Sequence, residues 1–174
     1  AGVDLAGVVA PERAADIIAS FTPDIITVPI ETDYLTTEHL DAILDEAEDK
    51  TAFVIGGGIG RKEETRELVR EFLKKTDLPG VIDADAIYAL KSSWGDIDLS
   101  NFVITPHANE FKVLTGKELK KSLDDRTDKA EQAAENLNLY GIGHEIKDEE
   151  KKQDGYSFRI VYKGPLYVEK DLSK

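Results

Sequence analysis

Short apolar runs alternate with segments of helical periodicity along most of the chain. Apolar runs that predict strands occupy residues 3–9, 25–30, 51–55, 81–82 and 102–104. Segments with apolar side chains at helical spacing follow them, at residues 11–18, 36–44, 63–75, 85–90 and 110–114. Strands whose apolar residues do not alternate with polar ones are typical of parallel sheets that helices cover on both faces. The pattern therefore predicts an α/β fold with a mostly parallel central sheet.

The pattern is less regular toward the C-terminus. Residues 126–137 predict a helix, and residues 156–162 predict a strand. Residues 145–154 are a dense run of charged side chains, which predicts a solvated hairpin tip or loop. The whole segment 139–156 is predicted to be a charged insertion or loop. A length of 174 residues predicts a single domain over residues 1–174.

Acidic residues dominate the charge of the chain. Lys and Arg number 22 against 35 Asp and Glu, so the net charge is −13. This charge argues against a general nucleic-acid binder and against a partner for anionic membranes. An anionic small molecule stays compatible, because backbone N–H groups can make a pocket locally positive. The absence of cysteine excludes disulfide and thiolate chemistry and makes a cytoplasmic location the expectation.

A cluster of glycines follows the strand predicted at residues 51–55. Glycines between a strand and a helix let backbone N–H groups approach an anion. The dinucleotide fingerprint does not fit, because Arg61 and Glu63 stand where its third glycine should fall, and the ending of a phosphate-binding P-loop is missing too. A tight crossover could also need glycine, but four glycines in five positions exceed that need. We therefore predict that Gly58 and Gly60 face a ligand.

Two aspartates follow the predicted strand at residues 81–82. Asp83 directly follows this buried strand and could hold a hydroxyl group or a hydrated magnesium ion, although a structural role fits equally well. Asp85 is expected only to cap the helix that follows.

His107 and Glu110 follow the strand at residues 102–104 and lie three positions apart, on one face of a first helical turn. The negative charge of Glu110 suits a helix N-terminus, and Thr105 or Asn109 is expected to cap the helix. These roles do not explain His107, and Pro106 rigidifies a loop that a simple connection would not require. We therefore predict that His107 binds a ligand. Substitution by alanine should weaken that binding with little loss of stability.

Four segments, taken in order, resemble one known family. They are Phe53-Val54-Ile55-Gly56-Gly57-Gly58-Ile59-Gly60, Val81-Ile82-Asp83-Ala84-Asp85-Ala86, Val103-Ile104-Thr105-Pro106-His107-Ala108-Asn109-Glu110-Phe111 and Lys163-Gly164-Pro165. Together they are similar to the ADP/ATP-dependent NAD(P)H-hydrate dehydratases of the ribokinase-like superfamily. The similarity is continuous over about residues 3–137. It implies a ribokinase-like three-layer sandwich, here incomplete at both ends.

The resemblance implies repair of hydrated NADH or NADPH. In that reaction ADP or ATP, with Mg²⁺, phosphorylates the hydroxyl of the hydrated nicotinamide ring, and elimination of phosphate restores the double bond. The resemblance also implies a homo-oligomer.

The same resemblance implies roles for individual residues. Gly60 and His107 would contact the hydrated dinucleotide, and Gly58 and Asp83 are predicted to lie in the same substrate site. Glu110 stands where related kinases keep a glutamate that organises magnesium and phosphate, which is an indirect role. The adenine nucleotide would run along Lys163, Gly164, Pro165, Leu166 and Tyr167.

Three departures from the family pattern shape the expectation. Gly57 stands where the family usually has proline, and the family's small-residue N-terminal segment is absent. The family's catalytic aspartate lies in a Gly-x-Gly-Asp turn, which does not occur here. With no methionine either, the chain is expected to be the central part of such an enzyme and not to catalyse as it stands. The alternatives are a small-molecule kinase of the same fold and a non-catalytic, truncated nucleotide-binding module.

Overall fold

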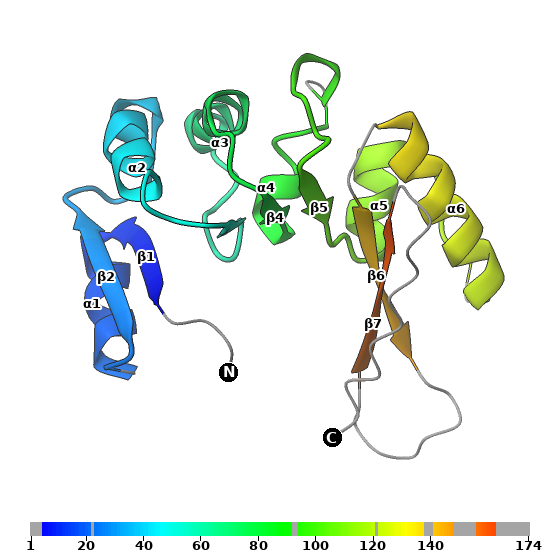
Figure 1. The fold of residues 1–174 in the computed structure, drawn as a ribbon, viewed down its shortest axis with the longest axis horizontal. Coiled ribbons are helices and arrows are strands. Elements are labelled where there is room, and N and C mark those ends of the chain that lie inside the picture. Colours follow the sequence, from blue (N-terminus) through cyan, green and yellow to red (C-terminus); the bar gives the residue numbers. More distant parts are fainter. Residues whose placement is uncertain are drawn as a thin grey trace.

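A computed structural model gives the fold of residues 5–21, 23–91, 94–120, 122–137, 141–147 and 156–162. It is an open α/β arrangement in which the described strands form two sheets (Figure 1). The α/β class and the mostly parallel strands agree with the sequence prediction. The prediction of one central sheet is not matched in the described residues, where the strands form a two-stranded sheet and a separate five-stranded sheet.

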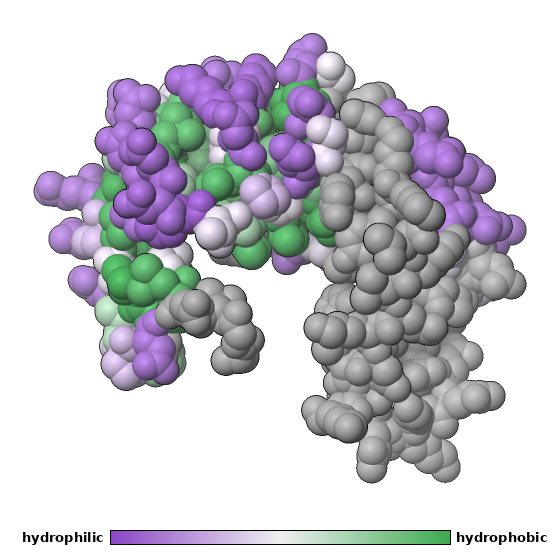
Figure 2. Space-filling view, viewed as in Figure 1, coloured by the Kyte–Doolittle hydropathy of each residue, from purple (hydrophilic) through white to green (hydrophobic). Residues whose placement is uncertain are grey.

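The first sheet holds β1 (Ala6–Pro11) and β2 (Ile25–Ile30), joined by helix α1 (Glu12–Phe21). The two strands are parallel, with Ala6 opposite Ile25. The prediction of a buried first strand is wrong, since Ala10 is the one fully buried residue of β1. Pro11 was predicted to lie in the first turn of the helix, but it is the last residue of β1. Figure 2 shows apolar surface over this unit, and the large hydrophobic side chains exposed there are Leu5, Ile17, Phe21 and Ile26.

The second sheet has the order β3-β4-β5-β6-β7. Three short strands, β3 (Phe53–Ile55), β4 (Gly80–Ile82) and β5 (Phe102–Ile104), match the predicted apolar runs and are parallel. β6 (Gly141–Lys147) continues them in parallel, and β7 (Tyr156–Tyr162) pairs with β6 in antiparallel fashion.

Within the segment predicted as a charged insertion or loop, residues 141–147 form the strand β6. Ile142 and Ile146 stand at strand spacing, and the backbone of Ile142 pairs with that of Ile104 in β5. Pairing to an existing sheet thus outweighs the low strand preference of the charged residues around them. Residues 148–155 lie outside the described part of the chain.

The helices of the second unit agree closely with the predicted segments. A 3₁₀ turn (Thr37–His39) leads into α2 (Leu40–Ala47), and α3 spans Glu63–Lys75 as predicted. The remaining helical segments are α4 (Ala84–Ile87), a 3₁₀ turn at Trp94–Asp96, α5 (Ala108–Thr115) and α6 (Leu123–Asn136). None of the described helices is long and apolar enough to cross a membrane.

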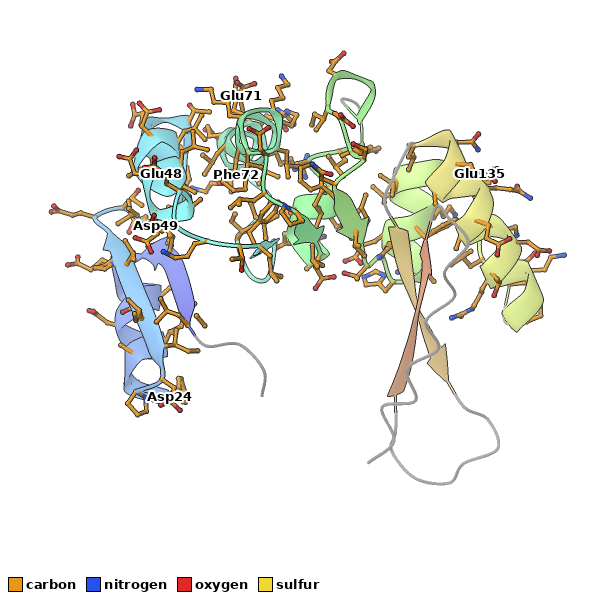
Figure 3. The ribbon with its side chains drawn as sticks, viewed as in Figure 1. Asp24, Glu48, Asp49, Glu71, Phe72 and Glu135 are labelled. Carbon is orange, nitrogen blue, oxygen red and sulfur yellow. The ribbon has the colours of Figure 1, made fainter. Side chains whose placement is uncertain are left out.

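One apolar core joins α3 to the second sheet. The ring of Phe53 in β3 meets Phe72 and Phe102 edge-on, at centroid distances of 5.1 and 5.6 Å. Gly80 lies directly beneath Phe53, where an added Cβ would approach the ring to 2.3 Å. Figure 3 shows Phe72 pointing from α3 toward the sheet and Glu71 pointing away. Within the described residues, this core cluster runs from Leu35 to Leu137 and takes nothing from β1 or α1.

We expect Phe72→Ala to lower the free energy of unfolding by about 3–5 kcal/mol, because it removes a buried ring and leaves a cavity. Glu71→Ala is the control on the same helix. It removes an exposed ion pair with Lys74 and should cost a small fraction of that amount. Urea unfolding of both variants measures the difference, and equal losses would contradict this description of the core.

Candidate functional site

Three strand-to-helix turns lie next to one another at the carboxyl edge of the second sheet. The sheet register places Ile55, Ile82 and Ile104 side by side at the strand ends. Backbone hydrogen bonds continue past them, from the Asp83 N–H to the Ile55 oxygen at 2.9 Å and from the Thr105 N–H to the Ile82 oxygen at 3.2 Å. We call residues 56–61, 83–85 and 105–110 the strand-end cluster. Open α/β sheets bind ligands at this edge.

The glycines of the first turn have different reasons to be glycine. Gly56 has φ +128°, and a Cβ there would lie 1.8 Å from the carbonyl oxygen of Asp83. Close packing of the crossover therefore requires this glycine. Gly58 and Gly60 also have positive φ, +69° and +89°, but an added Cβ would meet no atom of the described chain within 4 Å. Their surroundings are open, as ligand-facing positions need; their ligand role stays a prediction.

Asp83 joins the second turn to the third. Its Oδ1 accepts a hydrogen bond of 2.7 Å from the hydroxyl of Thr105, which ties the end of β4 to the end of β5. The next residue, Ala84, has φ +46° and is the one non-glycine residue of the described chain with positive φ. This conformation costs on the order of 1 kcal/mol and marks the turn as held by its neighbours.

Asp85 does not cap α4, so that prediction is wrong. Its carboxylate faces the glycine turn, where Oδ2 accepts from the Gly60 N–H at 3.2 Å and Oδ1 accepts from Nε of Arg61 at 2.5 Å. The guanidinium of Arg61 also lies 4.0 Å from the ring centroid of Tyr88. The hydrogen bond to Asp85 raises the pKa of the Arg61 guanidinium above its usual value. No role was predicted for Arg61, although a basic residue directly after a glycine cluster was the available signal.

His107 caps α5, where Thr105 or Asn109 was expected. Its Nδ1 accepts hydrogen bonds from the backbone N–H groups of Asn109 and Glu110, at 3.1 and 3.3 Å. A ring nitrogen that accepts carries no hydrogen, so these partners assign the hydrogen of the neutral ring to Nε2. Nε2 lies 3.1 Å from Oε1 of Glu110. The imidazole side chain remains 55% exposed.

Glu110 completes a capping box with His107. Its Oε2 accepts a 2.9 Å hydrogen bond from the His107 N–H, and its side chain is only 6% exposed. Both carboxylate oxygens are therefore engaged by His107. In the described part of the chain, no three His, Asp or Glu side chains are grouped so that they could hold a metal ion. In this arrangement Glu110 is not placed to be a direct ligand of a magnesium ion. Its indirect role in organising magnesium and phosphate stays a prediction.

The structure thus gathers Gly58, Gly60, Asp83, His107 and Glu110 at one edge of the sheet. The predicted nucleotide-binding residues Lys163, Gly164, Pro165, Leu166 and Tyr167 lie outside the described residues. A hollow of about 390 Å³ lies elsewhere, between the end of α3 and the start of β5, and includes none of the predicted site residues.

Comparison with known proteins agrees with this arrangement of motifs. A family model described as NAD(P)H-hydrate dehydratase matches residues 1–140, well over half of the chain. The chain belongs to the NAD(P)H-hydrate dehydratase family. A relative named bifunctional NAD(P)H-hydrate repair enzyme Nnr, from Pyrobaculum aerophilum, is 45% identical over 131 residues, which are 72% of this chain and 25% of the relative. The chain therefore spans about a quarter of the length of this curated relative.

Solved structures of low sequence identity share the fold of the family. A ribokinase-like superfamily protein from Enterococcus faecalis superposes with a TM-score of 0.64 at 18% identity, covering 92% of this chain and 50% of that one. The ADP/ATP-dependent NAD(P)H-hydrate dehydratase of Bacillus subtilis, co-crystallised with ATP and Mg²⁺, gives a TM-score of 0.61 at 20% identity, covering 82% and 47%. The fold of this family member is ribokinase-like, as the sequence resemblance implied.

We expect Gly56→Ala to destabilise the protein by about 2–5 kcal/mol, because the new Cβ would overlap the Asp83 carbonyl in a backbone conformation that favours glycine. The neighbouring Gly57→Ala is a matched control, since a Cβ there meets no described atom within 4 Å. It should change stability by less than about 0.5 kcal/mol. Denaturant unfolding measures both, and a stable Gly56→Ala protein would refute the close approach.

The cap formed by His107 changes the expectation for His107→Ala from little loss of stability to a loss of about 1 kcal/mol. His107→Asn should recover most of that loss, because a short amide side chain can accept the same backbone N–H groups. Thermal and urea unfolding of the two variants test the cap. If asparagine were as destabilising as alanine, the imidazole would stabilise the helix in some way other than capping.

Proposed function

We propose that this chain is part of an enzyme that dehydrates hydrated NADH or NADPH at the expense of ADP or ATP. The observation that carries the proposal is the strand-end cluster, in which three motifs distant in sequence are joined by direct hydrogen bonds at the ligand-binding edge of the sheet. Family membership supports the same reaction. Because the chain spans a quarter of the curated relative, the activity belongs to the proposal for the whole protein.

The proposed reaction has two steps, a phosphoryl transfer and an elimination. The hydroxyl oxygen of the hydrated ring attacks the terminal phosphorus of ADP or ATP and loses its proton to a base. The bond from that phosphorus to its bridging oxygen breaks, and AMP or ADP leaves. The C–O bond to the new phosphate group then breaks while the neighbouring carbon loses a proton, which forms the ring double bond and releases inorganic phosphate. A base is therefore needed close to the ring hydroxyl.

His107 is suited to contact the substrate and unsuited to be that base. Its Nδ1 lone pair is occupied by two backbone N–H groups, and its Nε2 carries the hydrogen. Neither nitrogen offers a lone pair to an incoming proton. The exposed face of the imidazole is available to pack against a ring and position it. This supports the expectation that the base is an aspartate in a Gly-x-Gly-Asp turn, which this chain lacks.

The other residues of the cluster would shape the substrate site. The N–H of Gly60 is already bonded to Asp85, so Gly60 would contribute close backbone approach, with Gly58 beside it. Asp83, oriented by Thr105, would accept a hydrogen bond from a substrate hydroxyl.

A bound nucleotide would supply the phosphoryl group, and Mg²⁺ would neutralise the negative charge of its phosphates. We place it along Lys163 to Tyr167, with Glu110 acting indirectly by holding His107 and the start of α5. The proposal includes a homo-oligomer, on the strength of the family resemblance, and a cytoplasmic location, on the strength of the absence of cysteine.

A chimera tests the activity. Residues 1–140 of this chain replace the matching region of the Pyrobaculum aerophilum relative, which supplies the flanking segments. We expect the chimera to convert hydrated NADH to NADH with ADP or ATP and Mg²⁺, measured by the return of NADH absorbance, with the parent enzyme as positive control. A folded but inert chimera would contradict the proposal. A stable phosphorylated product without elimination would favour the kinase alternative, and nucleotide binding without turnover the non-catalytic one.

His107→Asn in the same chimera separates the substrate contact from the cap. The variant keeps the cap but removes the imidazole, so we expect a KM for hydrated NADH raised about tenfold with stability nearly unchanged, as for the loss of a good polar or packing contact. An unchanged KM would leave His107 a structural residue only. His39→Asn, remote from the strand-end cluster in sequence, is the control for a histidine-to-asparagine change.

A further inference from the structure

The proposed substrate poses an electrostatic problem for this chain. A hydrated dinucleotide carries a diphosphate, whereas the chain has a net charge of −13 and its strand-end cluster contains Asp83, Asp85 and Glu110. An anion needs a positive or N–H-rich surface at this place. Arg61 supplies a positive charge within the cluster, directly after Gly60.

Arg61 is held in one orientation by two neighbours. Asp85 accepts from its Nε at 2.5 Å, and the ring of Tyr88 lies beneath its guanidinium at 4.0 Å. The same carboxylate accepts from the Gly60 N–H at 3.2 Å, so Asp85 fixes the arginine relative to the glycine turn. The adjacent basic residue, Lys62, is directed elsewhere, since its Nζ lies 3.4 Å from the ring centroid of Tyr34.

The guanidinium keeps donors for a ligand. Arginine has five N–H donors, and the hydrogen bond to Asp85 uses the one on Nε. The side chain is 53% exposed, and the space above Gly58 and Gly60 is open in the described structure. Planar paired donors of this kind match two oxygens of one phosphate. Because Asp85 and Tyr88 already order the side chain, binding costs little further conformational entropy.

We propose that Arg61 binds a phosphate group of the dinucleotide substrate, with Asp85 and Tyr88 as positioning residues and the open glycine turn as the space the phosphate enters. This inference rests on the proposed function for the identity of the substrate, but the anion contact can be tested apart from catalysis.

The experiment is isothermal titration calorimetry on the full chain, with hydrated NADH, with ADP-ribose, which shares its diphosphate, and with hydrated nicotinamide riboside, which has no phosphate. Arg61→Gln removes the charge, and Arg61→Lys keeps the charge without the planar donors. Lys74→Gln is the control, because Lys74 is a half-exposed, ion-paired cation on the last turn of α3. Circular dichroism establishes that each variant is folded.

We expect Arg61→Gln to weaken binding of hydrated NADH and ADP-ribose about tenfold or more, as for a lost charge-assisted hydrogen bond, and Arg61→Lys to weaken it less. Affinity for hydrated nicotinamide riboside should stay unchanged, and Lys74→Gln should change no affinity more than about twofold. The inference is overturned if Arg61→Gln binds the diphosphates as the wild type does, if it weakens the phosphate-free ligand equally, or if the wild type binds neither diphosphate.

Failure of the proposed function would look different. ADP-ribose binding that depends on Arg61, in a protein whose chimera does not dehydrate hydrated NADH, would leave the anion contact standing and remove the dehydratase reaction. An active chimera whose Arg61→Gln variant keeps the wild-type KM would support the dehydratase reaction and overturn the anion contact.

Discussion

The carbonyl oxygen of Asp83 occupies the space that a side chain at residue 56 would need, and the arrangement of the site depends on this close approach. It lets the Asp83 N–H bond to Ile55 and brings the turn after β3 against the turn after β4. From there Asp85 reaches back to Gly60 and Arg61, and Asp83 reaches forward to Thr105. One steric constraint on the backbone thus places the side chains of three turns within reach of one another.

Elements whose bounds depend on local residue patterns could be predicted from the sequence. The bounds of α3 match the prediction because thirteen residues of clear helical periodicity, acidic at the start and basic at the end, leave little choice. The contact between Gly60 and Asp85 could not be predicted in this way, because it spans 25 positions and depends on sheet register. The cap at His107 was missed because general preferences rank threonine and asparagine above histidine. β6 was missed because its stability comes from pairing with β5.

The hydrogen bonds around His107 give one residue a structural role and, in the proposal, a chemical one. Capping consumes the lone pair that a base would use, and it fixes the imidazole at the start of α5 with part of its surface exposed. Glu110 is occupied in a similar way, since its Oε2 accepts from the His107 N–H and its Oε1 lies next to the His107 Nε2. In this part of the chain the two titratable groups of the motif hold the start of α5 in place. In the proposed reaction, the proton transfer therefore belongs to another group.

The separation of the two sheets leaves edges of the described strands unpaired, and the net charge of the chain affects what can bind to them. Within the described residues, β1 and β3 each keep an outer edge without a partner, and Val54 on β3 is 75% exposed. Unpaired parallel edges of this kind are templates on which further strands can add. A charge of −13 on every copy makes such additions between copies repulsive, and dissolved salt weakens that repulsion. We therefore expect charge repulsion to oppose edge-to-edge association of copies, with a strength that falls as ionic strength rises.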